Sequence, residues 1–388
     1  MTQLQFNLDM NVLKDSVINS NIDAVIKSAI VLVLNEFMEK ERDEYLQAYP
    51  YERTDYRRDY RNGYYERELT MSIGKIKLKV PRTRNGEFSP SVFEKYARCD
   101  QALVLSMLEM VINGVSTRKV THIVEQLCGE NVSKSFVSSL TQKLDPIVKD
   151  WANRPLNTAY YPYVFVDAMY IKVREHQRVV SKAVYIATAI TEKNQREILG
   201  LNVDHAESYE SWSQFFKHLK SRGLQSPKLV ISDAHQGLQK AIQREFIGTS
   251  WQRCTVHFKR NITEKLPKKN SSEIRTMIKR VFESVTIDDM RTFKDELMSK
   301  FGDDPKYAKA LKILDDGFED AIQYMNHPES LHPHIRSTNS LERLNQEVRR
   351  REKVIRVFPN TQSAFRLVGA VLMQYQETFY SKKKSLTK

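Results

Sequence analysis

The sequence has few cysteines and no long apolar run. Its three cysteines, Cys99, Cys128 and Cys254, are an odd number at wide spacing, which argues against a disulfide framework and fits a reducing compartment. No apolar run approaches the roughly 20 residues that span a bilayer. Residues 1–10 lack both the basic start and the apolar stretch of a signal peptide. We therefore expect a cytoplasmic protein that does not act on a membrane.

Acidic residues are outnumbered by basic ones. The 388 residues include 61 Lys and Arg against 48 Asp and Glu, a formal charge of +13. A surface of this charge attracts a polyanion, so nucleic acid is the first candidate partner, although many basic proteins have no nucleic-acid role. The hydrophobic share of 41% is enough to bury cores in two or three domains.

The N-terminal part of the chain predicts helix, then a connector, then a strand. Apolar side chains in residues 1–50 recur at three- and four-residue steps, so this region is expected to be helical, with a core or dimer face. Residues 75–80 alternate with period two and predict a strand that carries a basic face and ends at Pro81.

Between them, residues 51–65 alternate tyrosine and arginine with acids around a turn signal at Asn62-Gly63. This mixture suits phosphate and base contacts, but it is equally typical of a solvated charged connector. The candidate DNA contacts here are Arg57, Arg58 and Arg61.

The segment 115–144 has the pattern of a helix-turn-helix. Gly129 can close the first helix and Ser133 can cap the second. The apolar residues expected between the two helices are Val120, Ile123, Val124, Leu127, Phe136, Val137, Leu140 and Leu144. The side chains left exposed for a major groove are Lys134, Ser135, Ser138 and Thr141, with Ser139 and Gln142 as further candidates. A plain helical hairpin has the same periodicity, but the basic charge of the chain favours DNA binding.

After Pro155 the composition shifts toward β-branched and apolar runs. Strands are expected at 163–173, 178–190, 197–203 and 228–232, with helices at 208–221 and after Gly237. Three strands followed by helix, strand and helix is the order of an RNase H-like mixed sheet. Residues from Ser271 to about Leu331 are helical throughout and resemble a separate insertion before a last long helix that starts near Ser337.

The expected fold is therefore α/β, with an RNase H-like mixed sheet, an all-helical insertion and a helical N-terminal DNA-binding region. The expected segments are an N-terminal helical region (1–60), a basic β-rich segment (61–98), a helix-turn-helix domain (99–152), the RNase H-like catalytic domain (153–265 and 334–360), the insertion (266–333), and a C-terminal helix with a basic tail (361–388).

Two aspartates stand where apolar strands are expected. Asp167 interrupts a run that is otherwise apolar on both faces, where an unpaired carboxylate is costly. Asp233 ends another apolar run just before a helix, where open α/β sheets place functional groups. Each alone has an ordinary explanation, a buried ion pair or a helix cap, but the two together favour a bound cation.

A third carboxylate is needed because hard cations prefer near-octahedral sets of oxygen ligands. We select Glu342, on a helix where positions 342, 345, 346 and 349 share one face. Asn345 and Arg349 lie beside it to meet DNA, whereas Glu347 falls elsewhere and is expected to form a salt bridge. Taken alone, the segment also fits a charge-rich solvated helix.

These carboxylates predict two Mg²⁺ ions about 4 Å apart, with Mn²⁺ as a substitute. Such a pair activates water or a 3′-hydroxyl and stabilises the attacking and leaving oxygens of a phosphodiester, so no side-chain nucleophile is needed. The chain between Asp233 and Glu342 is far longer than one crossover needs, and the helical insertion accounts for the excess.

Cys254 and His257 have a spacing that suits two metal ligands, but structural zinc normally needs four. No second Cys-containing pair exists, and only His332 with His334 are candidates to complete such a site. We favour a packing or hydrogen-bonding role near the active site, with His235 also in a supporting position.

Five segments of the chain resemble Mutator-type bacterial insertion-sequence transposases, which are DDE transposases. The segments are RNGYYER (61–67), GVSTRKV (114–120), SDAHQGL (232–238), WQRCTVHF (251–258) and ERLNQEVRRR (342–351). The resemblance covers nearly the whole chain in the family's order. The family's catalytic triad falls on Asp167, Asp233 and Glu342, and its Cys-x-x-His signature falls on Cys254 and His257.

The resemblance implies a bacterial, nucleoid-associated transposase that binds terminal inverted repeats through its N-terminal region and joins them to target DNA. It also implies an RNase H-like core with an all-helical insertion, a homodimer and a circular DNA intermediate. Two alternatives remain, an RNase H-like nuclease that hydrolyses without strand transfer, and a helix-turn-helix repressor with an inert sheet domain.

Overall fold

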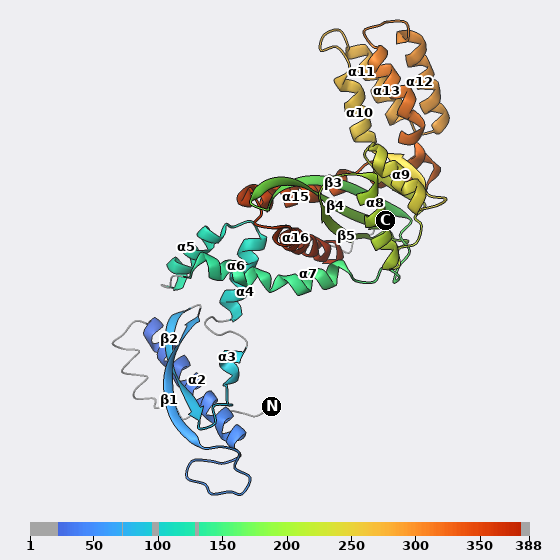
Figure 1. The fold of residues 1–388 in the computed structure, drawn as a ribbon. Coiled ribbons are helices and arrows are strands. Elements are labelled where there is room, and N and C mark those ends of the chain that lie inside the picture. Colours follow the sequence, from blue (N-terminus) through green and yellow to red (C-terminus); the bar gives the residue numbers. More distant parts are fainter. Residues whose placement is uncertain (1–21, 72, 95–100, 129–131, 382–388) are drawn as a thin grey trace. The chain divides into compact units, whose positions relative to one another are not determined.

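The computed structural model describes residues 22–71, 73–94, 101–128 and 132–381, and Figure 1 labels its elements. The chain divides into two compact units, Met1–Thr141 and Gln142–Lys388. The helix predicted for residues 1–21 and the proposed helix end at Gly129 lie outside the described residues. Within the described ranges, no helix has both the length and the apolar character to cross a membrane.

In the first unit, a long helix packs on a two-stranded sheet (Figure 1). The elements of this part are α2 (Ile22–Leu46), β1 (Arg61–Met71), β2 (Gly74–Thr83) and α3 (Ser91–Glu94). The strands pair antiparallel, and the apolar residues Ile76, Leu78 and Val80 of β2 are buried. They point the same way because successive strand residues alternate between the two faces, so one face of the hairpin forms the core against α2.

Two predicted boundaries in this sheet are wrong. Pro81 does not end the strand but lies within β2, opposite Tyr64, since a two-stranded sheet leaves an edge on which a missing N–H is tolerated. Asn62 and Gly63 do not form a turn between elements. They lie within β1 at a register shift between Arg61 and Tyr64, where Gly63 takes a φ of +68° that glycine adopts without strain.

Over residues 75–80 the exposed face of β2 is wholly basic, as predicted, but the face of the whole hairpin is not. Lys75, Lys77 and Lys79 are exposed as expected, but Lys77 lies opposite Glu68 and Lys79 opposite Glu66 across the strands. The Lys75 ammonium also lies 2.8 Å from a Glu68 carboxylate oxygen. The acids of β1 therefore balance much of the lysine charge on β2, which the sequence of β2 alone does not reveal.

Three further helices of the first unit share one apolar cluster. They are α4 (Gln101–Ile112), α5 (Thr117–Cys128) and α6 (Lys134–Gln142). Val120 and Val124 of α5 pack with Val137 and Leu140 of α6 in this cluster. The Ser133 hydroxyl accepts a hydrogen bond of 3.1 Å from the Phe136 amide, so the predicted cap of the second helix is confirmed.

Two residues predicted for this apolar contact lie elsewhere. Leu127 is 72% exposed, because it falls on the outer side of α5. Leu144 begins the next helix, α7 (Leu144–Ala152), rather than extending α6. The packing of α5 on α6 fits both a helix-turn-helix and a helical hairpin, so the DNA-binding assignment stays a prediction.

A five-stranded mixed sheet forms the centre of the second unit. Its strands are β3 (Tyr163–Glu175), β4 (Arg178–Ile190), β5 (Arg196–Asp204), β6 (Leu229–Ser232) and β7 (Ser250–Arg253), in the order β5-β4-β3-β6-β7. The first three pair antiparallel, whereas β6 runs parallel to β3 and β7 parallel to β6. The first four strands match the predicted ones closely, and β7 was not predicted.

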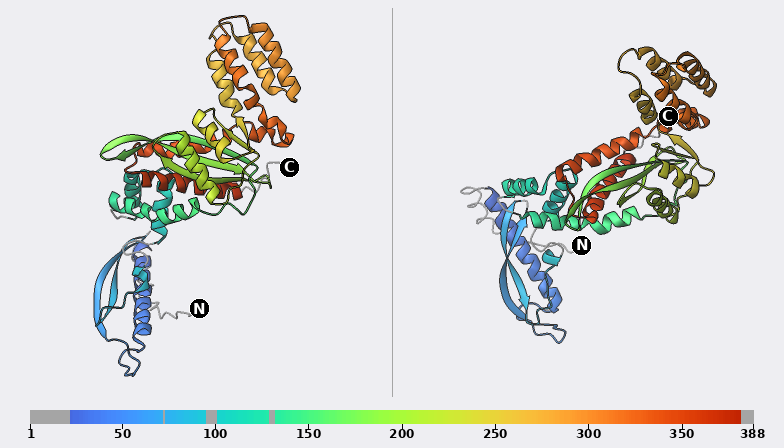
Figure 2. Two further views of the ribbon diagram at one scale, coloured as in Figure 1. Left: turned by 45° about the vertical axis from the view of Figure 1, so that its right-hand side comes forward. Right: turned by 45° about the horizontal axis from the view of Figure 1, so that its top comes forward.

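Helices accompany the sheet, as Figure 2 shows for the red C-terminal pair beside the green strands. The helices of this layer are α8 (Tyr209–Ser221), α9 (Gln236–Glu245), α15 (Asn339–Ile355) and α16 (Thr361–Ser381). Helix α16, predicted as part of a separate C-terminal segment, packs against β5 and α7 and accepts a 2.6 Å hydrogen bond from the Ile198 amide at Gln376. It is therefore part of the sheet domain.

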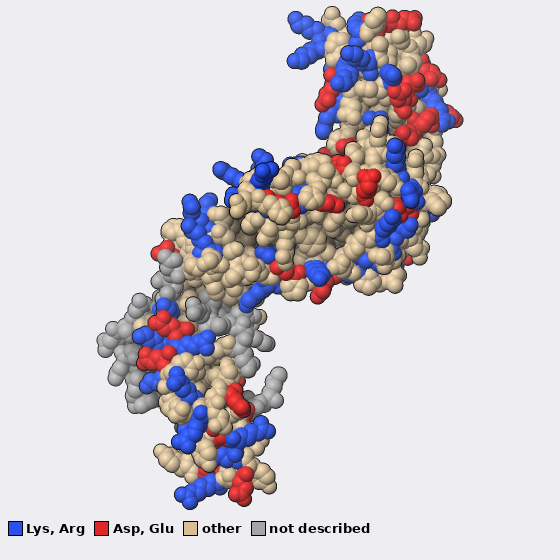
Figure 3. All heavy atoms as spheres, viewed as in Figure 1, with Lys and Arg blue, Asp and Glu red and all other residues tan. Residues whose placement is uncertain are grey.

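The insertion is a helical body with its own apolar cluster, which includes Phe258 and Ile262 of a helix that lies before the predicted start at residue 266. Its elements are α10 (Thr255–Glu264), α11 (Ser272–Glu283), α12 (Ile287–Phe301), α13 (Ala308–Ala321), the short 3₁₀ helices Gln323–Asn326 and Glu329–Leu331, and α14 (His332–Ile335). Basic and acidic side chains interleave on its surface in Figure 3, and exposed ion pairs such as Arg291 with Glu319 join α12 to α13.

Aromatic packing beneath α8 sets the stability of the sheet domain. The Trp212 side chain is fully buried among Tyr185, Phe215 and Phe216. Because Trp212→Ala leaves a large cavity, we expect it to destabilise this domain by about 3–5 kcal/mol. Thermal unfolding of the full chain measures the effect. Ile247→Ala, at a side chain that is 85% exposed, is the control and should change stability by less than about 0.5 kcal/mol; equal effects of both changes contradict the prediction.

Candidate active site

The sheet sets two aspartates side by side. Asp167 lies on the central strand β3, and Asp233 directly follows β6, the parallel neighbour of β3. The register pairs Phe165 with Ile231, and each aspartate follows its member of that pair by two positions. The two carboxyl groups therefore leave adjacent strands at the same level, where β6 ends beside the middle of β3.

Glu342 joins them from the first turn of α15, a helix that packs on β3. Its amide donates a 2.9 Å hydrogen bond to the Thr338 carbonyl, which fixes the start of this helix. The Glu342 Oε1 atom lies 3.3 Å from Nε2 of His257. The structure thus brings the three predicted carboxylates to one place from β3, the end of β6 and α15.

His257 bridges two of the carboxylates. It lies in the first turn of α10, with Nδ1 facing an Asp233 oxygen and Nε2 facing Glu342. The hydrogen bond to Asp233, and then that to Cys254, raises the pKa of His257 to about 10. A protonated imidazole therefore stands between Asp233 and Glu342 and offsets their mutual repulsion.

Cys254 connects the start of the insertion to the start of α15. Its side chain is fully buried, and its sulfur lies 3.4 Å from the amide and 3.3 Å from the hydroxyl of Thr338. The same hydroxyl lies 3.5 Å from Glu342 Oε1. Burial alone would raise the pKa of the Cys254 thiol, but hydrogen bonds with His257 and Thr338 outweigh it, and the pKa is lowered.

Asn345 orients Asp167. Its amide nitrogen donates a 2.7 Å hydrogen bond to Asp167 Oδ2, and the residue is only 7% exposed. The Ala168 amide donates a 2.9 Å hydrogen bond to the other Asp167 oxygen. Burial, followed by the charge of Asp233, raises the pKa of the Asp167 carboxyl to about 7. Asn345 was predicted to meet DNA. It lies one helix turn after Glu342 on α15, and its amide nitrogen is engaged with the Asp167 carboxylate.

The remaining predicted neighbours divide into two groups. Arg349 is exposed on α15, while Glu347 forms ion pairs with Arg350, at 3.1 Å, and with Arg351, which confirms its predicted salt-bridge role. His235 caps α9, because its ring nitrogen accepts a 3.3 Å hydrogen bond from the Leu238 amide. It stabilises a helix start two residues after Asp233.

The predicted DNA contacts on α6 are accessible. Lys134, Ser135, Ser138, Ser139 and Gln142 are exposed, and Thr141 is half-buried. The first two line a hollow of about 590 Å³ between α5 and α6, together with Arg118 and His122. This hollow is open and partly basic, as a phosphate-contacting surface requires.

The arginines predicted in the connector differ in availability. Arg58 is exposed, and Arg57 stacks over the Tyr60 ring at 5.1 Å. Arg61 is turned inward, where its guanidinium lies 2.5 Å from an Asp43 oxygen and 2.7 Å from the Ala48 carbonyl oxygen. Arg61 therefore fastens β1 to α2, a role that the local sequence does not indicate.

Two residues of the candidate site were not predicted from the sequence. Thr338 contacts both Cys254 and Glu342, and Glu207 adds negative charge that contributes to the raised pKa of Asp167. The Trp212 indole donates a 3.1 Å hydrogen bond to Glu207 and holds this acid in place. The one signal in the sequence was the position of Thr338 just before the Glu342 helix.

The chain is similar to known proteins along its whole length. The family described as "Transposase, Mutator family" matches residues 1–382. The transposase for insertion sequence element IS256 in transposon Tn4001 from Staphylococcus aureus is 53% identical over 99% of this chain and 98% of its own length. The transposase for ISRM5 from Rhizobium meliloti is 38% identical over 98% and 94%. That for IS1081 from Mycobacterium tuberculosis is 35% identical over 84% and 78%.

Proposed function

Because the chain belongs to the Mutator family of insertion-sequence transposases, we propose that it cuts the DNA at the ends of its element and joins the freed 3′-hydroxyl to target DNA. The observation that carries this proposal is the convergence of Asp167, Asp233 and Glu342 from three separate elements. The strand order, with three antiparallel strands followed by two parallel ones, supports an RNase H-like interpretation of the sheet.

The donor set fits hard divalent cations. Three carboxylates supply the oxygen ligands that Mg²⁺ and Mn²⁺ prefer, and a cation would offset the burial and the neighbouring charge of Asp233 that raise the pKa of Asp167. Asp233, Cys254 and His257 also offer ligand atoms within 4.8 Å of one another. This group has three ligand atoms, one fewer than structural zinc needs, and the Cys254 sulfur already accepts a hydrogen bond from the Thr338 hydroxyl. Asp167, Asp233 and Glu342 are therefore the proposed holders of two Mg²⁺ ions.

Bound there, two such ions activate water or a 3′-hydroxyl and stabilise the charge that develops on the phosphodiester oxygens. The side chains around the ions hold the three carboxylates in position. Asn345 holds one oxygen of Asp167, and His257 keeps Asp233 and Glu342 at a fixed separation. Thr338 and Cys254 hold the start of α15, so that Glu342 faces the aspartates. None of these side chains is required to attack the DNA.

DNA binding is assigned to the N-terminal unit, in which the α5–α6 hollow and the exposed Lys134 and Ser135 provide a surface for the terminal inverted repeats. Ser138 and Thr141 follow along the same helix, and Arg349 on α15 is a separate proposed DNA contact in the second unit. The homodimer, the circular intermediate and the nucleoid association stay predictions from the family resemblance.

A strand-transfer assay on DNA that carries the element ends tests the proposal. With Mg²⁺ or Mn²⁺, the full chain should yield both nicked and joined products, and chelation of the metal should remove both while DNA binding persists. Nicking without joining identifies the RNase H-like nuclease instead. Binding without either product, at any metal concentration, identifies the helix-turn-helix repressor.

A further inference from the structure

The exposed basic residues of β2 change from lysine to arginine at Pro81. Up to Lys79, every second residue is an exposed lysine, but Val80 and Pro81 are both buried, so the exposed positions shift by one. Beyond this point Arg82 and Arg84 face solvent. The end of the hairpin therefore presents guanidinium groups in place of ammonium groups, and guanidinium is the group that binds phosphate through two parallel N–H donors.

Both arginines lie on tyrosine rings. The Arg82 guanidinium carbon lies 4.5 Å from the centre of the Tyr65 ring, and that of Arg84 lies 5.7 Å from the centre of the Tyr60 ring. Such stacking orders a guanidinium while leaving its N–H edges available. In the part of the chain that the structure describes, neither side chain takes part in a hydrogen bond or an ion pair. Their donors are unused, and the charge of Arg84 acts on the nearby Asp59 carboxylate. Burial alone would raise the pKa of that carboxyl, but hydrogen bonds and this charge hold it below its usual value.

The backbone beneath them is held by hydrogen bonds. Both oxygens of the buried Asp59 accept hydrogen bonds from main-chain amides, one of 2.7 Å from Tyr60 and one of 3.0 Å from Asn85. The Arg84 amide also donates a 2.8 Å hydrogen bond to the Tyr60 carbonyl. The segment before β1 and the segment after β2 are thus tied together, and the arginines start from a fixed base.

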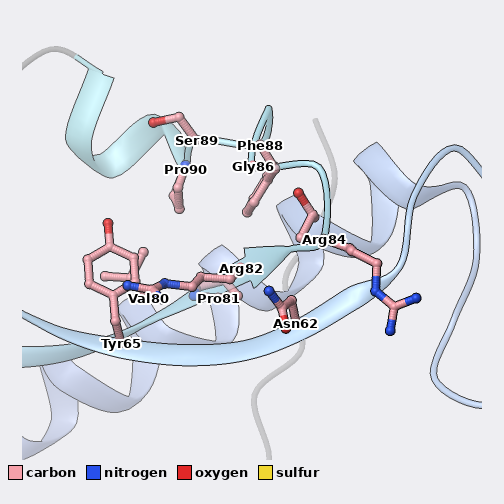
Figure 4. A pocket seen from close by; sticks show the side chains of 11 residues that line it. Asn62, Tyr65, Val80, Pro81, Arg82, Arg84, Gly86, Phe88, Ser89 and Pro90 are labelled. Atoms are coloured by element: carbon pink, nitrogen blue, oxygen red, sulfur yellow. The ribbon is translucent and has the colours of Figure 1, made fainter.

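A cavity of about 440 Å³ opens between this base and the loop that leads to α3. Figure 4 shows Arg82 extended across Tyr65 on one side of the cavity, and Arg84 on the other side with its guanidinium directed outward past Asn62, with Ser89 on the loop above them. Its lining contains no carboxylate. The lysine face of the same strand is different, since Glu66 and Glu68 lie opposite its lysines.

We propose that this cavity with Arg82 and Arg84, here called the arginine pocket, binds the phosphate backbone of DNA. The inference rests on the proposed function, because it takes DNA as the partner, and it adds a contact surface separate from the α5–α6 hollow. Phosphate contacts carry no sequence information, so the arginine pocket holds the register of the DNA while other residues read the bases.

Paired substitutions on one strand test this assignment. The variant Arg82→Ala/Arg84→Ala removes two charges from the arginine pocket, and Lys77→Ala/Lys79→Ala removes two from the lysine face of the same strand. The dissociation constant of the full chain is measured by fluorescence anisotropy against salt, on a duplex with the element ends and on a random duplex of equal length. Circular dichroism and thermal unfolding show whether each variant is folded.

We expect the arginine pair to weaken binding about tenfold on both duplexes, since hydrogen bonds to charged groups are the strong ones. The slope of log affinity against log salt should fall by about 1 for each phosphate that the variant no longer binds. The lysine pair should leave the slope unchanged. Tyr65→Phe, which keeps the ring under Arg82, should bind as the wild type does, whereas Tyr65→Ala should bind more weakly.

Equal effects of the two pairs would show a general charge effect and overturn the arginine pocket, as would an unchanged slope in the arginine pair. Weaker binding of the element-end duplex alone would also overturn it, because it would mean base reading. In each of these cases the wild type still cleaves and joins element ends, so the proposed function stands. A wild-type chain that neither binds nor cleaves such DNA would overturn both proposals.

Discussion

Asp167→Asn is expected to lower the rate of DNA cleavage by at least about three orders of magnitude, which corresponds to about 4 kcal/mol of transition-state stabilisation. Asparagine has the shape of aspartate but lacks the negative charge that holds a divalent cation. Its carbonyl oxygen can still accept the hydrogen bond that Asn345 donates to Asp167, but its amide nitrogen then faces the Ala168 amide and the second hydrogen bond is lost. The change therefore removes the charge of a metal ligand and one hydrogen bond, with the shape of the side chain kept. Initial rates of nicking on element-end DNA measure the loss.

Two further measurements separate chemistry from folding in this variant. Because burial and the charge of Asp233 both oppose ionisation of Asp167, the melting temperature without metal should stay equal or rise in Asp167→Asn. DNA affinity should also be unchanged. Asp204→Asn, at the end of β5, is the matched control and should cleave normally. Cleavage by Asp167→Asn within tenfold of the wild type would refute the proposed metal site.

His257→Ala is expected to lower cleavage by about 10- to 100-fold, the usual effect of removing a group that orients metal ligands. Without the imidazolium, Asp233 and Glu342 repel each other and are no longer held at one separation. Weaker metal binding should be the main cause. The activity should therefore recover in part as Mg²⁺ is raised, and the apparent metal affinity obtained from cleavage rates measures this.

Recovery of cleavage activity at high Mg²⁺ would show that His257 positions metal ligands, rather than only stabilising the fold. A variant that had lost only stability would show a lower melting temperature and no dependence of its defect on metal concentration. His218→Gln is a suitable control, since this histidine is exposed on α8 and contacts none of the carboxylates. A His257→Ala enzyme with wild-type rates at low Mg²⁺ would contradict the prediction.

Strands with both faces buried were predictable. β3, β4 and β6 are apolar on both faces over most of their length, so the runs stand out from the flanking polar segments. Strand β7 was missed because Ser250–Arg253 is only four residues long and partly exposed. Pro81 and Gly63 misled the prediction for the opposite reason. Both are typical of chain breaks, yet the hairpin edge and a bulge accommodate them within strands.

The candidate site was predictable only in part, because its contacts join distant positions. Asp167 and Asp233 stood out as carboxylates at apolar strands. The hydrogen bond between Asn345 and Asp167 spans 178 positions, and that between Thr338 and Cys254 spans 84. No local pattern encodes which of several polar side chains on α15 turns toward the sheet. Packing of α15 on β3 decides this.

The insertion leaves and rejoins the sheet domain at a single point. The Thr255 amide donates a 3.0 Å hydrogen bond to the Arg336 carbonyl, one residue after Cys254 and two residues before Thr338. A segment whose two ends meet behaves as a surface loop toward the rest of the fold, and lengthening such a loop costs little free energy. The outer helices α11 and α12 can therefore differ in length at little cost to the sheet domain, while His257 on α10 and the contacts of Gln252 with Ala321 and Tyr324 hold the base of the insertion beside Asp233 and Glu342.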